Sequence, residues 1–443
     1  MIYVVGNSIA ALSAVSQISK LRDVTWMRRS GKLGGVFGGL LVEGVICDIG
    51  MINFELASAT NRPVLNVVDY DRRRVNDSAN FCNVVRDFVM QFMELVLLPE
   101  PKMLFRGKAI PDFLYGHQLN VLSSFQENLS HAIEMYTDEL FKDLHPRNKY
   151  LNGHVLEKVK YQDLSRRLLG NRLHNEVIEP WLTKLIGNYA PNLPVSKHRA
   201  AWAPLYYPET LIDANKRSLY NFGLTASFSY PITGSISAMV SRIFERVSNL
   251  SNVTVVESSE SFSRLTHSAL STDNCEKVIA CEQLTFGDFG NDQQSKSSPK
   301  TLIDLIYVKV DHGVLNPDFY VVNSCEASVP WYRLSISNGN TPTSPHIVCI
   351  EAGTGKISES ATLNALGLAE IGITDQNSQI VARFKSIPAL HLIDESWDMN
   401  YGRSLEELRL IFPKLRAIGA AGGRWNNTFS DQVIQGIRES ELL

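Results

Sequence analysis

The sequence has few cysteines, and their spacing excludes several classes of site. None of them forms a C-x-x-C pair, the spacing that is typical of zinc sites and redox motifs. The sequence therefore predicts no metal site and no disulfide framework, and it favours buried thiols. The six cysteines are Cys47, Cys82, Cys275, Cys281, Cys325 and Cys349.

Long apolar runs and an excess of charge of one sign are also missing. The longest apolar stretch, Phe88 to Leu98, is broken by Gln91 and Glu94 and is too short to cross a bilayer. The chain starts with strand-like residues in place of a basic leader. A net charge of −3 gives no reason to expect a nucleic-acid partner. We therefore expect a cytoplasmic protein with no transmembrane segment.

The familiar motifs of protein nucleophiles and metal hydrolases are absent as well. The sequence contains no G-x-S-x-G, no H-E-x-x-H and no Walker motif. Its 443 residues exceed one typical hydrophobic core, so two or three subdomains are expected. These absences leave the sequence without a recognisable motif for a protein nucleophile.

The first fifty residues have the pattern of one βαβ unit. Met1 to Val5 is a short apolar, β-branched run, Gly6 follows at once, and small and apolar residues recur at helical spacing from Ile9 to Leu21. Val24 to Met27 reads as the next strand. A strand, a glycine turn and a helix N-terminus together present unpaired backbone N–H groups and a favourable dipole to an anion.

The dinucleotide fingerprint in this unit is incomplete. G-x-G-x-x-G reads Gly6-Asn7-Ser8-Ile9-Ala10-Ala11, so only the first glycine is kept. The ribose-binding acid expected after the second strand is replaced by Arg28-Arg29, and an arginine cannot accept a hydrogen bond. Taken alone, the pattern fits a dinucleotide site and an ordinary βαβ unit equally well.

Further motifs follow in an order that resembles a known family. The segment Lys32-Leu33-Gly34-Gly35-Val36-Phe37 and the turn Cys47-Asp48-Ile49-Gly50 resemble the second signature of a flavoprotein superfamily. This superfamily includes amine oxidases, protoporphyrinogen oxidase, phytoene desaturases and UDP-galactopyranose mutase. In it, a glycine pair follows the second strand and an Asp-x-Gly turn approaches the flavin. The plain alternative is a loop before a hairpin.

The middle of the chain carries weaker matches. Pro180, Trp181, Lys184 and Gly187 resemble the superfamily's P-[YW]-x-x-K-x-x-G segment beside the substrate cavity, although a helix with an internal proline and a glycine cap would look the same. The turn Phe228 to Gly234 resembles its YP-x-G-G turn and precedes a helix expected to end near Val247.

A second group of middle matches comes from two expected strands. Glu276, Cys281 and Gln283 take the places of the acid, alanine and proline in the superfamily's D-x-V-I-x-A-x-P element. Tyr332 and Arg333 lie in a strand that resembles P-[YF]-x-R, whose arginine holds the substrate diphosphate in the mutase. An aromatic-stacked structural arginine is the open alternative at this strand.

The C-terminus completes the resemblance. Gly423, Arg424, Asp431 and Ile434 match the superfamily's G-R-x-x…D-x-x-I-x-x-G flavin motif, while its closing glycine, Gly436, comes one residue early. A helix is expected to begin near Ser430-Asp431. The resemblance thus runs along nearly the whole chain.

The resemblance implies an α/β fold: a Rossmann-like FAD-binding domain assembled from both chain ends, with an inserted mixed α+β substrate domain. The expected FAD-binding domain comprises residues 1–60, 228–285 and 395–443. A mainly helical cap region would cover residues 61–227, including helices over Phe113–Leu144 and Val155–Leu169, and a strand-rich substrate region would cover 300–390.

The resemblance also implies the site residues and the ligands. FAD is the expected cofactor and a small molecule the substrate, with Trp181, Lys184, Tyr332 and Arg333 as substrate-binding candidates; the oligomeric state, a dimer included, stays open. The cofactor-binding candidates are Gly6, Ser8, Ile9, Ala10, Arg28, Arg29, Gly34, Gly35, Val36, Asp48, Gly50, Gly423, Arg424, Asp431, Gln432 and Val433.

Three functions remain open from the sequence. The leading hypothesis is an FAD-dependent oxidoreductase in which hydride passes from the substrate to flavin N5, so that no protein nucleophile is needed. The alternatives are a flavin-dependent nucleotide-sugar mutase and a degenerate relative that serves as a binding or scaffold protein. Arg28 and the two lost fingerprint glycines motivate the last of these.

Overall fold

A computed structural model describes most of the chain, and every structural statement below concerns the described residues. These are residues 1–50, 54–56, 78–99, 101–112, 159–194, 227–289, 300–311, 319–337, 346–391, 395–422 and 428–443. The helix predicted over Phe113–Leu144 lies outside them, as do Gly423 and Arg424.

A five-stranded parallel sheet forms one half of the molecule, in the strand order β10-β2-β1-β11-β17. β-Branched residues dominate its central strands, because those strands are covered on both faces. The strands come from three distant parts of the chain: β1 Ile2–Val5, β2 Val24–Arg29, β10 Val253–Ser258, β11 Lys277–Ala280 and β17 Leu415–Ala417.

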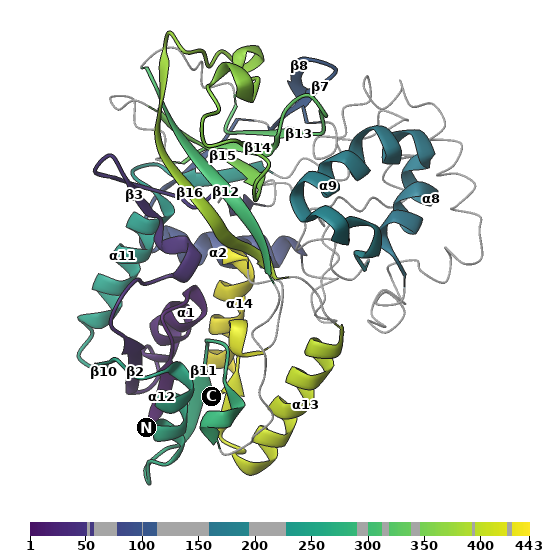
Figure 1. The fold of residues 1–443 in the computed structure, drawn as a ribbon. Coiled ribbons are helices and arrows are strands. Elements are labelled where there is room, and N and C mark those ends of the chain that lie inside the picture. The colour runs from purple at the N-terminus through teal and green to yellow at the C-terminus, as the bar shows by residue number, and fades with distance from the viewer. Residues whose placement is uncertain are drawn as a thin grey trace.

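Helices cover both faces of this sheet, and alternate strand residues face opposite cores. Val4 and Ile279 pack with α1, α11 and α14, whereas Val5 and Val278 pack with α12 and α13. Figure 1 shows these helices around the strands, with the chain's first and last residues at the same end. The helices are α1 Ile9–Ile18, α11 Ile236–Ser248, α12 Phe262–Leu270, α13 Glu395–Ile411 and α14 Phe429–Glu441.

A seven-stranded mixed sheet forms the other half, in the order β16-β12-β15-β14-β13-β7-β8. All neighbours are antiparallel except β13 and β7, which are parallel. In Figure 1 the long strands β12 and β16 run side by side from the upper tip to the centre. The strands are β7 Lys102–Phe105, β8 Lys108–Pro111, β12 Lys300–Val310, β13 Val321–Ser324, β14 Trp331–Ile336, β15 His346–Gly353 and β16 Ser378–His391.

One helical arm packs against this second sheet. It consists of α8 Tyr161–Leu173, a short π-helix over His174–Ile178 and α9 Glu179–Ile186, and it lies to the right in Figure 1. Gly187, with φ of 57°, ends α9 as the sequence predicts. Trp181 of α9 belongs to the same core as Tyr332 of the sheet.

Smaller elements connect the two halves. The hairpin of β3 Leu40–Val42 and β4 Val45–Cys47 follows the glycine-rich turn, which contains a 3₁₀ segment at Gly35–Gly38. The apolar stretch Phe88–Leu98, which the sequence shows to be too short to cross a bilayer, contains the end of one helix and one strand. The remaining elements are β5 Phe54–Leu56, α2 Ser78–Met90, β6 Leu95–Leu97 and β9 Ser227–Pro231.

The predicted α/β class is confirmed, with one parallel and one mixed sheet. The predicted βαβ unit is confirmed as β1, α1 and β2, although α1 ends at Ile18, before the predicted Leu21. The proposed division of the chain into domains stays a prediction.

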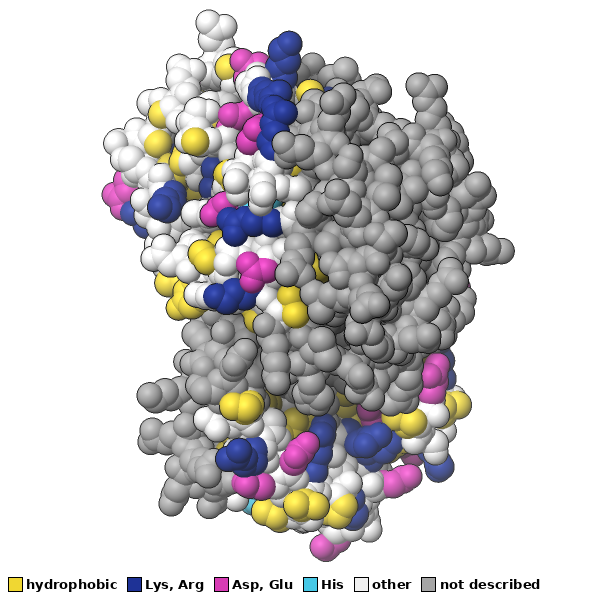
Figure 2. Space-filling model, turned by 90° about the vertical axis from the view of Figure 1, so that its right-hand side faces the viewer, with side chains coloured by type: hydrophobic (Ala, Val, Ile, Leu, Met, Phe, Trp, Pro, Cys, Tyr) yellow, Lys and Arg dark blue, Asp and Glu magenta, His cyan; other side chains and the backbone are white. Residues whose placement is uncertain are grey.

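Surface and composition agree with a globular protein. On the described part of the face in Figure 2, basic and acidic side chains lie interspersed. Within the described ranges, no helix is both long and apolar enough to cross a membrane, and no group of three or more metal-ligating side chains lies together. Five of the six cysteines are buried, as expected: Cys47, Cys275, Cys281, Cys325 and Cys349.

Candidate functional site

The turn after β1 is shaped by Gly6, whose φ is 146°. A Cβ atom at this position would lie 3.0 Å from Cys281 Cβ and 3.1 Å from Glu282 Cγ. A larger residue would therefore be strained in conformation and crowded by the end of β11. Ser8 follows as the N-cap of α1, and its side chain makes no capping hydrogen bond. The N–H groups of the turn are thus available to another acceptor.

That acceptor is the carboxylate of Glu282. Its Oε1 atom accepts hydrogen bonds from the backbone N–H groups of Asn7, at 3.0 Å, and Ser8, at 2.8 Å. Burial raises the pKa of Glu282 above its ordinary value, while the two backbone hydrogen bonds act in the opposite direction. The turn therefore binds an anionic oxygen, and this oxygen belongs to the chain itself.

The next donor of α1 is also occupied by a side chain. The N–H group of Ala10 donates to Gln432 Oε1 at 3.2 Å, from the first turn of α14. Thr428 caps α14 by accepting from the N–H of Asp431 at 3.1 Å and donating to that residue's carboxylate at 2.7 Å. The predicted candidates Asp431 and Gln432 thus lie where α14 meets the start of α1.

The two helices cross in direct backbone contact. Ser13 of α1 donates from Oγ to the carbonyl oxygen of Val433 at 2.8 Å. A Cβ atom on Gly436 would lie 2.6 Å from the backbone nitrogen of Ala14. Gly436, which comes one residue early for the family motif, is therefore the residue that permits the close crossing.

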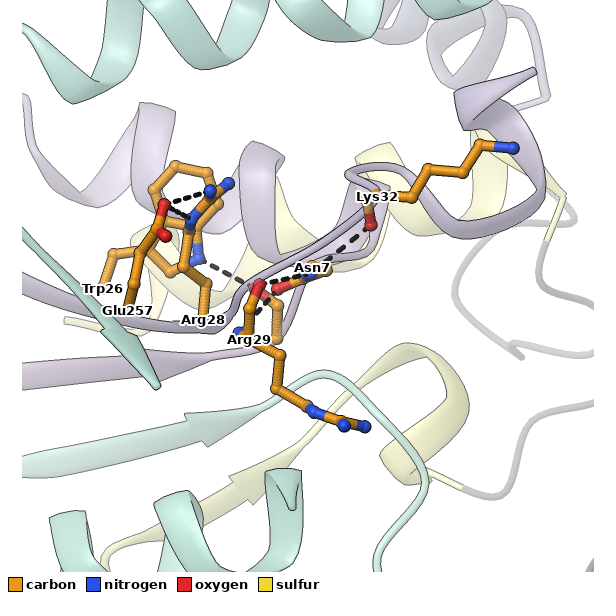
Figure 3. Close-up of polar contacts among 7 residues, drawn as sticks. Asn7, Trp26, Arg28, Arg29, Lys32 and Glu257 are labelled. Atoms are coloured by element: carbon orange, nitrogen blue, oxygen red, sulfur yellow. Dashed lines mark hydrogen bonds and ion pairs between the residues drawn. The ribbon is translucent and has the colours of Figure 1, made fainter. Parts of the chain in front are cut away.

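Arg28 lies at the end of β2, where the family has its ribose-binding acid. Its guanidinium forms an ion pair with Glu257, the residue directly opposite on β10, and Nε donates to Glu257 Oε1 at 2.8 Å (Figure 3). The guanidinium carbon also lies 4.7 Å from the ring centroid of Phe244. The Arg28 side chain is only 9% exposed, whereas Glu257 is 51% exposed. A half-exposed carboxylate is therefore present beside the end of β2, but it comes from the neighbouring strand.

Asn7 joins the turn to the loop after β2. Its side chain donates to the Arg29 carbonyl oxygen at 3.0 Å and accepts from the Arg29 N–H at 3.1 Å (Figure 3). Its own carbonyl oxygen accepts from the N–H of Gly34 at 2.7 Å. Arg29 is exposed, and its side chain points away from Asn7 toward Phe262, 5.7 Å from that ring's centroid.

The predicted glycine pair forms a left-handed turn. Gly34 and Gly35 have φ values of 76° and 57°, and a Cβ on Gly34 would lie 3.0 Å from Val240 of α11. A Cβ on Gly35 would meet nothing within 4 Å among the described residues, and Val36 is half exposed. Gly34 is thus required by packing, whereas Gly35 faces open space.

Asp48 lies fully buried where the elements of the two halves meet. Tyr230 of β9 donates its hydroxyl hydrogen to Asp48 Oδ2, and Oδ1 has no hydrogen-bond partner among the described residues. Burial raises the pKa of Asp48 to about 7, and the hydrogen bond from Tyr230 opposes that shift. Gly50, two residues on, has φ of 70° and lies against Glu351.

Arg333 is paired inside the second sheet. Its Nε and Nη2 atoms donate to the two carboxylate oxygens of Glu351, each at 2.7 Å, and Tyr332 donates to Glu351 Oε2 at 3.0 Å. Arg333 and Glu351 face each other in register on β14 and β15, and both are buried. Glu351 thus neutralises the cation that the family resemblance assigns to a substrate diphosphate.

The other two substrate candidates lie in the interface between α9 and the sheet. Trp181 is buried. Lys184 donates from Nζ to the backbone oxygens of Glu326 and, at 3.1 Å, Trp331. Burial lowers the pKa of Lys184 to about 8. Both residues therefore hold α9 against the sheet.

Three acids that contact the predicted segments are not among the residues predicted from the sequence. Glu257, Glu282 and Glu351 contact Arg28, the Gly6 turn and Arg333 respectively. A signal for Glu282 was present, because it lies inside the element from Glu276 to Gln283, directly after the expected strand. The carboxyl ends of neighbouring parallel strands meet at the same edge of a sheet.

Comparison with known proteins identifies the class at the level of the fold. No protein-family model and no curated protein sequence matches the chain. A reduced UDP-galactopyranose mutase matches with a TM-score of 0.64 at 14% identity, covering 99% of this chain and 93% of the other. Wild-type putrescine oxidase bound to putrescine matches with 0.56 at 12% identity, covering 99% and 98%. An oxidoreductase from Methanosarcina mazei matches with 0.56 at 11% identity, covering 99% of both chains.

These three structures span nearly the whole of the chain. The chain therefore shares its fold with a UDP-galactopyranose mutase, a putrescine oxidase and an oxidoreductase, and the resemblance predicted from the sequence motifs is confirmed at the level of the fold. At these identities the likeness establishes the fold and leaves the reaction and substrate open.

Proposed function

We propose that this protein is an FAD-dependent oxidoreductase acting on a small-molecule substrate. The observation that carries the proposal is the anion site of the Gly6 turn, where two backbone N–H groups at the start of α1 already hold a carboxylate oxygen. A diphosphate needs the same donors and the same helix dipole. When bound, the flavin supplies hydride acceptance at N5.

The chain's own residues support this assignment in three places. The backbone of Gly6 to Ala10 would hold the diphosphate, and the open side of Gly35 leaves room beside the glycine pair. The buried carboxyl of Asp48 orders the hairpin turn through Tyr230. Glu257, half exposed at the end of β10, offers the ribose acceptor that Arg28 does not.

The donor set fits a diphosphate only after one rearrangement. Glu282 occupies the N–H groups of Asn7 and Ser8, so these donors become available when its side chain swings away. Gln432 is neutral and, through its side-chain N–H₂, can donate to a phosphate oxygen as readily as its Oε1 accepts from Ala10.

The oxidoreductase is favoured over the mutase by Arg333. A nucleotide-sugar mutase needs an uncompensated cation for its substrate's diphosphate, whereas Nε and Nη2 of Arg333 both donate to Glu351. The bidentate pair supports the structural alternative for this arginine.

A second candidate function is a flavin-free binding protein. The occupied turn and the ion pair of Arg28 favour it, because both replace ligand contacts by contacts within the chain. The same experiment decides between the two candidates.

The test is the absorbance spectrum of the purified protein together with a calorimetric titration of cofactor-free protein with FAD. We expect a yellow protein with the two visible bands of oxidised flavin, and saturable FAD uptake after the cofactor is removed. Colourless protein that takes up no FAD would exclude the oxidoreductase and leave the flavin-free candidate.

A further inference from the structure

The carboxylate of Glu282 stands where a bound ligand's anion would stand. Glu282 lies two residues beyond β11, the strand beside β1, and its Oε1 atom reaches the N–H groups of Asn7 and Ser8 across 275 and 274 residues of sequence. The crowding of Glu282 Cγ and Oε1 against Gly6 shows that the carboxylate fills the space above the turn. The anion site is therefore occupied by a side chain of the protein itself.

A second anion cannot share this position. The two N–H groups and the α1 dipole favour one negative group, and a phosphate oxygen placed there would meet the Glu282 carboxylate at contact distance. Among the described residues, no lysine or arginine forms an ion pair with Glu282 that could compensate two anions together. A diphosphate and the Glu282 carboxylate are thus mutually exclusive at the turn.

The side chain of Glu282 can move away from the Gly6 turn. Its hydrogen bonds are all to one short turn, from the backbone N–H groups of Asn7 and Ser8 and from the Ser8 side chain. Glu282 lies at a partly exposed position in the loop that follows β11. Glutamate has rotatable χ angles that can carry the carboxylate outward. The Gly6 turn itself is held independently, by the side chain of Asn7 and by the bond from Trp26 Nε1 to the Gly6 carbonyl oxygen at 2.8 Å.

We propose that Glu282 is a built-in competitor that closes the anion site of the ligand-free protein and is displaced by the diphosphate of an entering dinucleotide. The proposal rests on the function proposed above, and it adds a regulation of the same site. The observed affinity for a dinucleotide then depends on how much more strongly the ligand's diphosphate interacts with the Gly6 turn than the Glu282 carboxylate does.

The experiment compares cofactor-free wild type with Glu282→Ala and Glu282→Gln. Glu276→Gln is the matched control, since it removes one negative charge at the opposite end of the same strand, where Glu276 is 55% exposed. FAD and adenosine 5′-diphosphate are titrated separately by calorimetry. The second probe carries the diphosphate without the flavin.

Removal of the competitor should raise affinity for both probes. We expect Glu282→Ala to bind FAD and adenosine diphosphate at least tenfold more tightly than wild type. Glu282→Gln should lie between the two, because its amide oxygen still accepts from the turn but carries no charge. The Glu276→Gln control should stay within twofold of wild type.

Thermal unfolding gives a second readout. Ligand-free Glu282→Ala should melt below wild type, because the N–H groups of Asn7 and Ser8 lose their acceptor. Saturating FAD should raise the melting temperature of this variant more than that of wild type. If Glu282→Ala does not fold, the calorimetric titration and the thermal unfolding are both carried out on Glu282→Gln.

The outcomes separate this inference from the proposed function. If wild type binds FAD, and both Glu282 variants bind it equally well or more weakly, Glu282 is not a competitor. The proposed FAD-dependent function is then unaffected. If no form binds FAD but the Glu282 variants gain affinity for adenosine diphosphate, the proposal that Glu282 competes for the anion site is supported. The proposed FAD-dependent function is then wrong. If no form binds either probe, both the competitor role of Glu282 and the proposed FAD-dependent function are wrong.

Discussion

At the scale of single residues, the site is distinguished by acids that meet its expected ligand-binding groups. Glu257 pairs with Arg28 across neighbouring strands, and Glu351 pairs with Arg333 in the same way. Glu282 takes the N–H groups of the Gly6 turn. In each case a group at an expected ligand-binding position has a partner within the chain.

The Arg333–Glu351 pair provides a prediction about stability. Arg333→Met should lower the free energy of unfolding by about 3 kcal/mol, because it leaves the buried Glu351 carboxylate without its cation. Chemical denaturation measures the change. Arg172→Met is the control, since Arg172 and Glu176 form an exposed i,i+4 pair whose loss should cost at most about 0.5 kcal/mol.

The same variant tests the mutase alternative. If Arg333 is structural, the folded fraction of Arg333→Met keeps whatever affinity wild type has for a uridine diphosphate sugar. A variant as stable as wild type that loses nucleotide-sugar binding would make Arg333 a substrate ligand and favour the mutase.

At the scale of secondary structure, the site depends on the crossing of α1 and α14. Small residues on α1 and Gly436 on α14 let the two backbones touch, and this contact places Gln432 over the N–H of Ala10. The crossing links the first helix of the chain to the last, so the geometry of the anion site depends on both.

Gly436→Ala should therefore be destabilising. The added Cβ would lie 2.6 Å from the Ala14 nitrogen and 2.8 Å from the Ala10 carbonyl oxygen, and overpacking of this kind costs roughly 1–3 kcal/mol. Gly402→Ala in α13 is the control. Its Cβ meets nothing within 4 Å, so the better helix propensity of alanine should stabilise by up to about 1 kcal/mol. Equal effects of the two substitutions on urea unfolding would contradict the tight crossing.

At the scale of the whole molecule, Asp48 joins the seven-stranded sheet to the small three-stranded sheet β5-β9-β6. Its backbone N–H donates to the Ser337 carbonyl oxygen at 2.8 Å, and its carbonyl oxygen accepts from the Tyr307 hydroxyl at 2.8 Å. Its side chain accepts from Tyr230 of the small three-stranded sheet. The ionisation of this one buried carboxyl group therefore bears on the stability of the entire fold.

The raised pKa of Asp48 predicts how stability depends on pH. The folded pKa of about 7 exceeds the ordinary value of 3.8, so between these values the folded state keeps a proton that the unfolded state has lost. The contribution of Asp48 is thus fully present below about pH 4 and is lost as pH rises through 7, and it amounts to roughly 4 kcal/mol. Asp48→Asn cannot ionise, so the difference in unfolding free energy between wild type and this variant should change over that interval. A difference independent of pH from 4 to 8 would show that Asp48 is not protonated in the fold.

The sequence by itself determined the βαβ unit, the Gly6 and Gly34 turns, the start of α14 and the α/β class of the fold. These features depend on local patterns of apolar spacing, glycine and helix caps. Each pattern can be recognised within a segment of a few tens of residues, without knowledge of the rest of the chain. The tertiary structure decided what those motifs contact. Glu282 reaches the Gly6 turn, and Glu257 reaches Arg28, across 275 and 229 residues of sequence, because parallel strands from distant segments bring their carboxyl ends to one edge. No local pattern encodes such a pairing, since it exists only once the sheet has set the order and register of its strands.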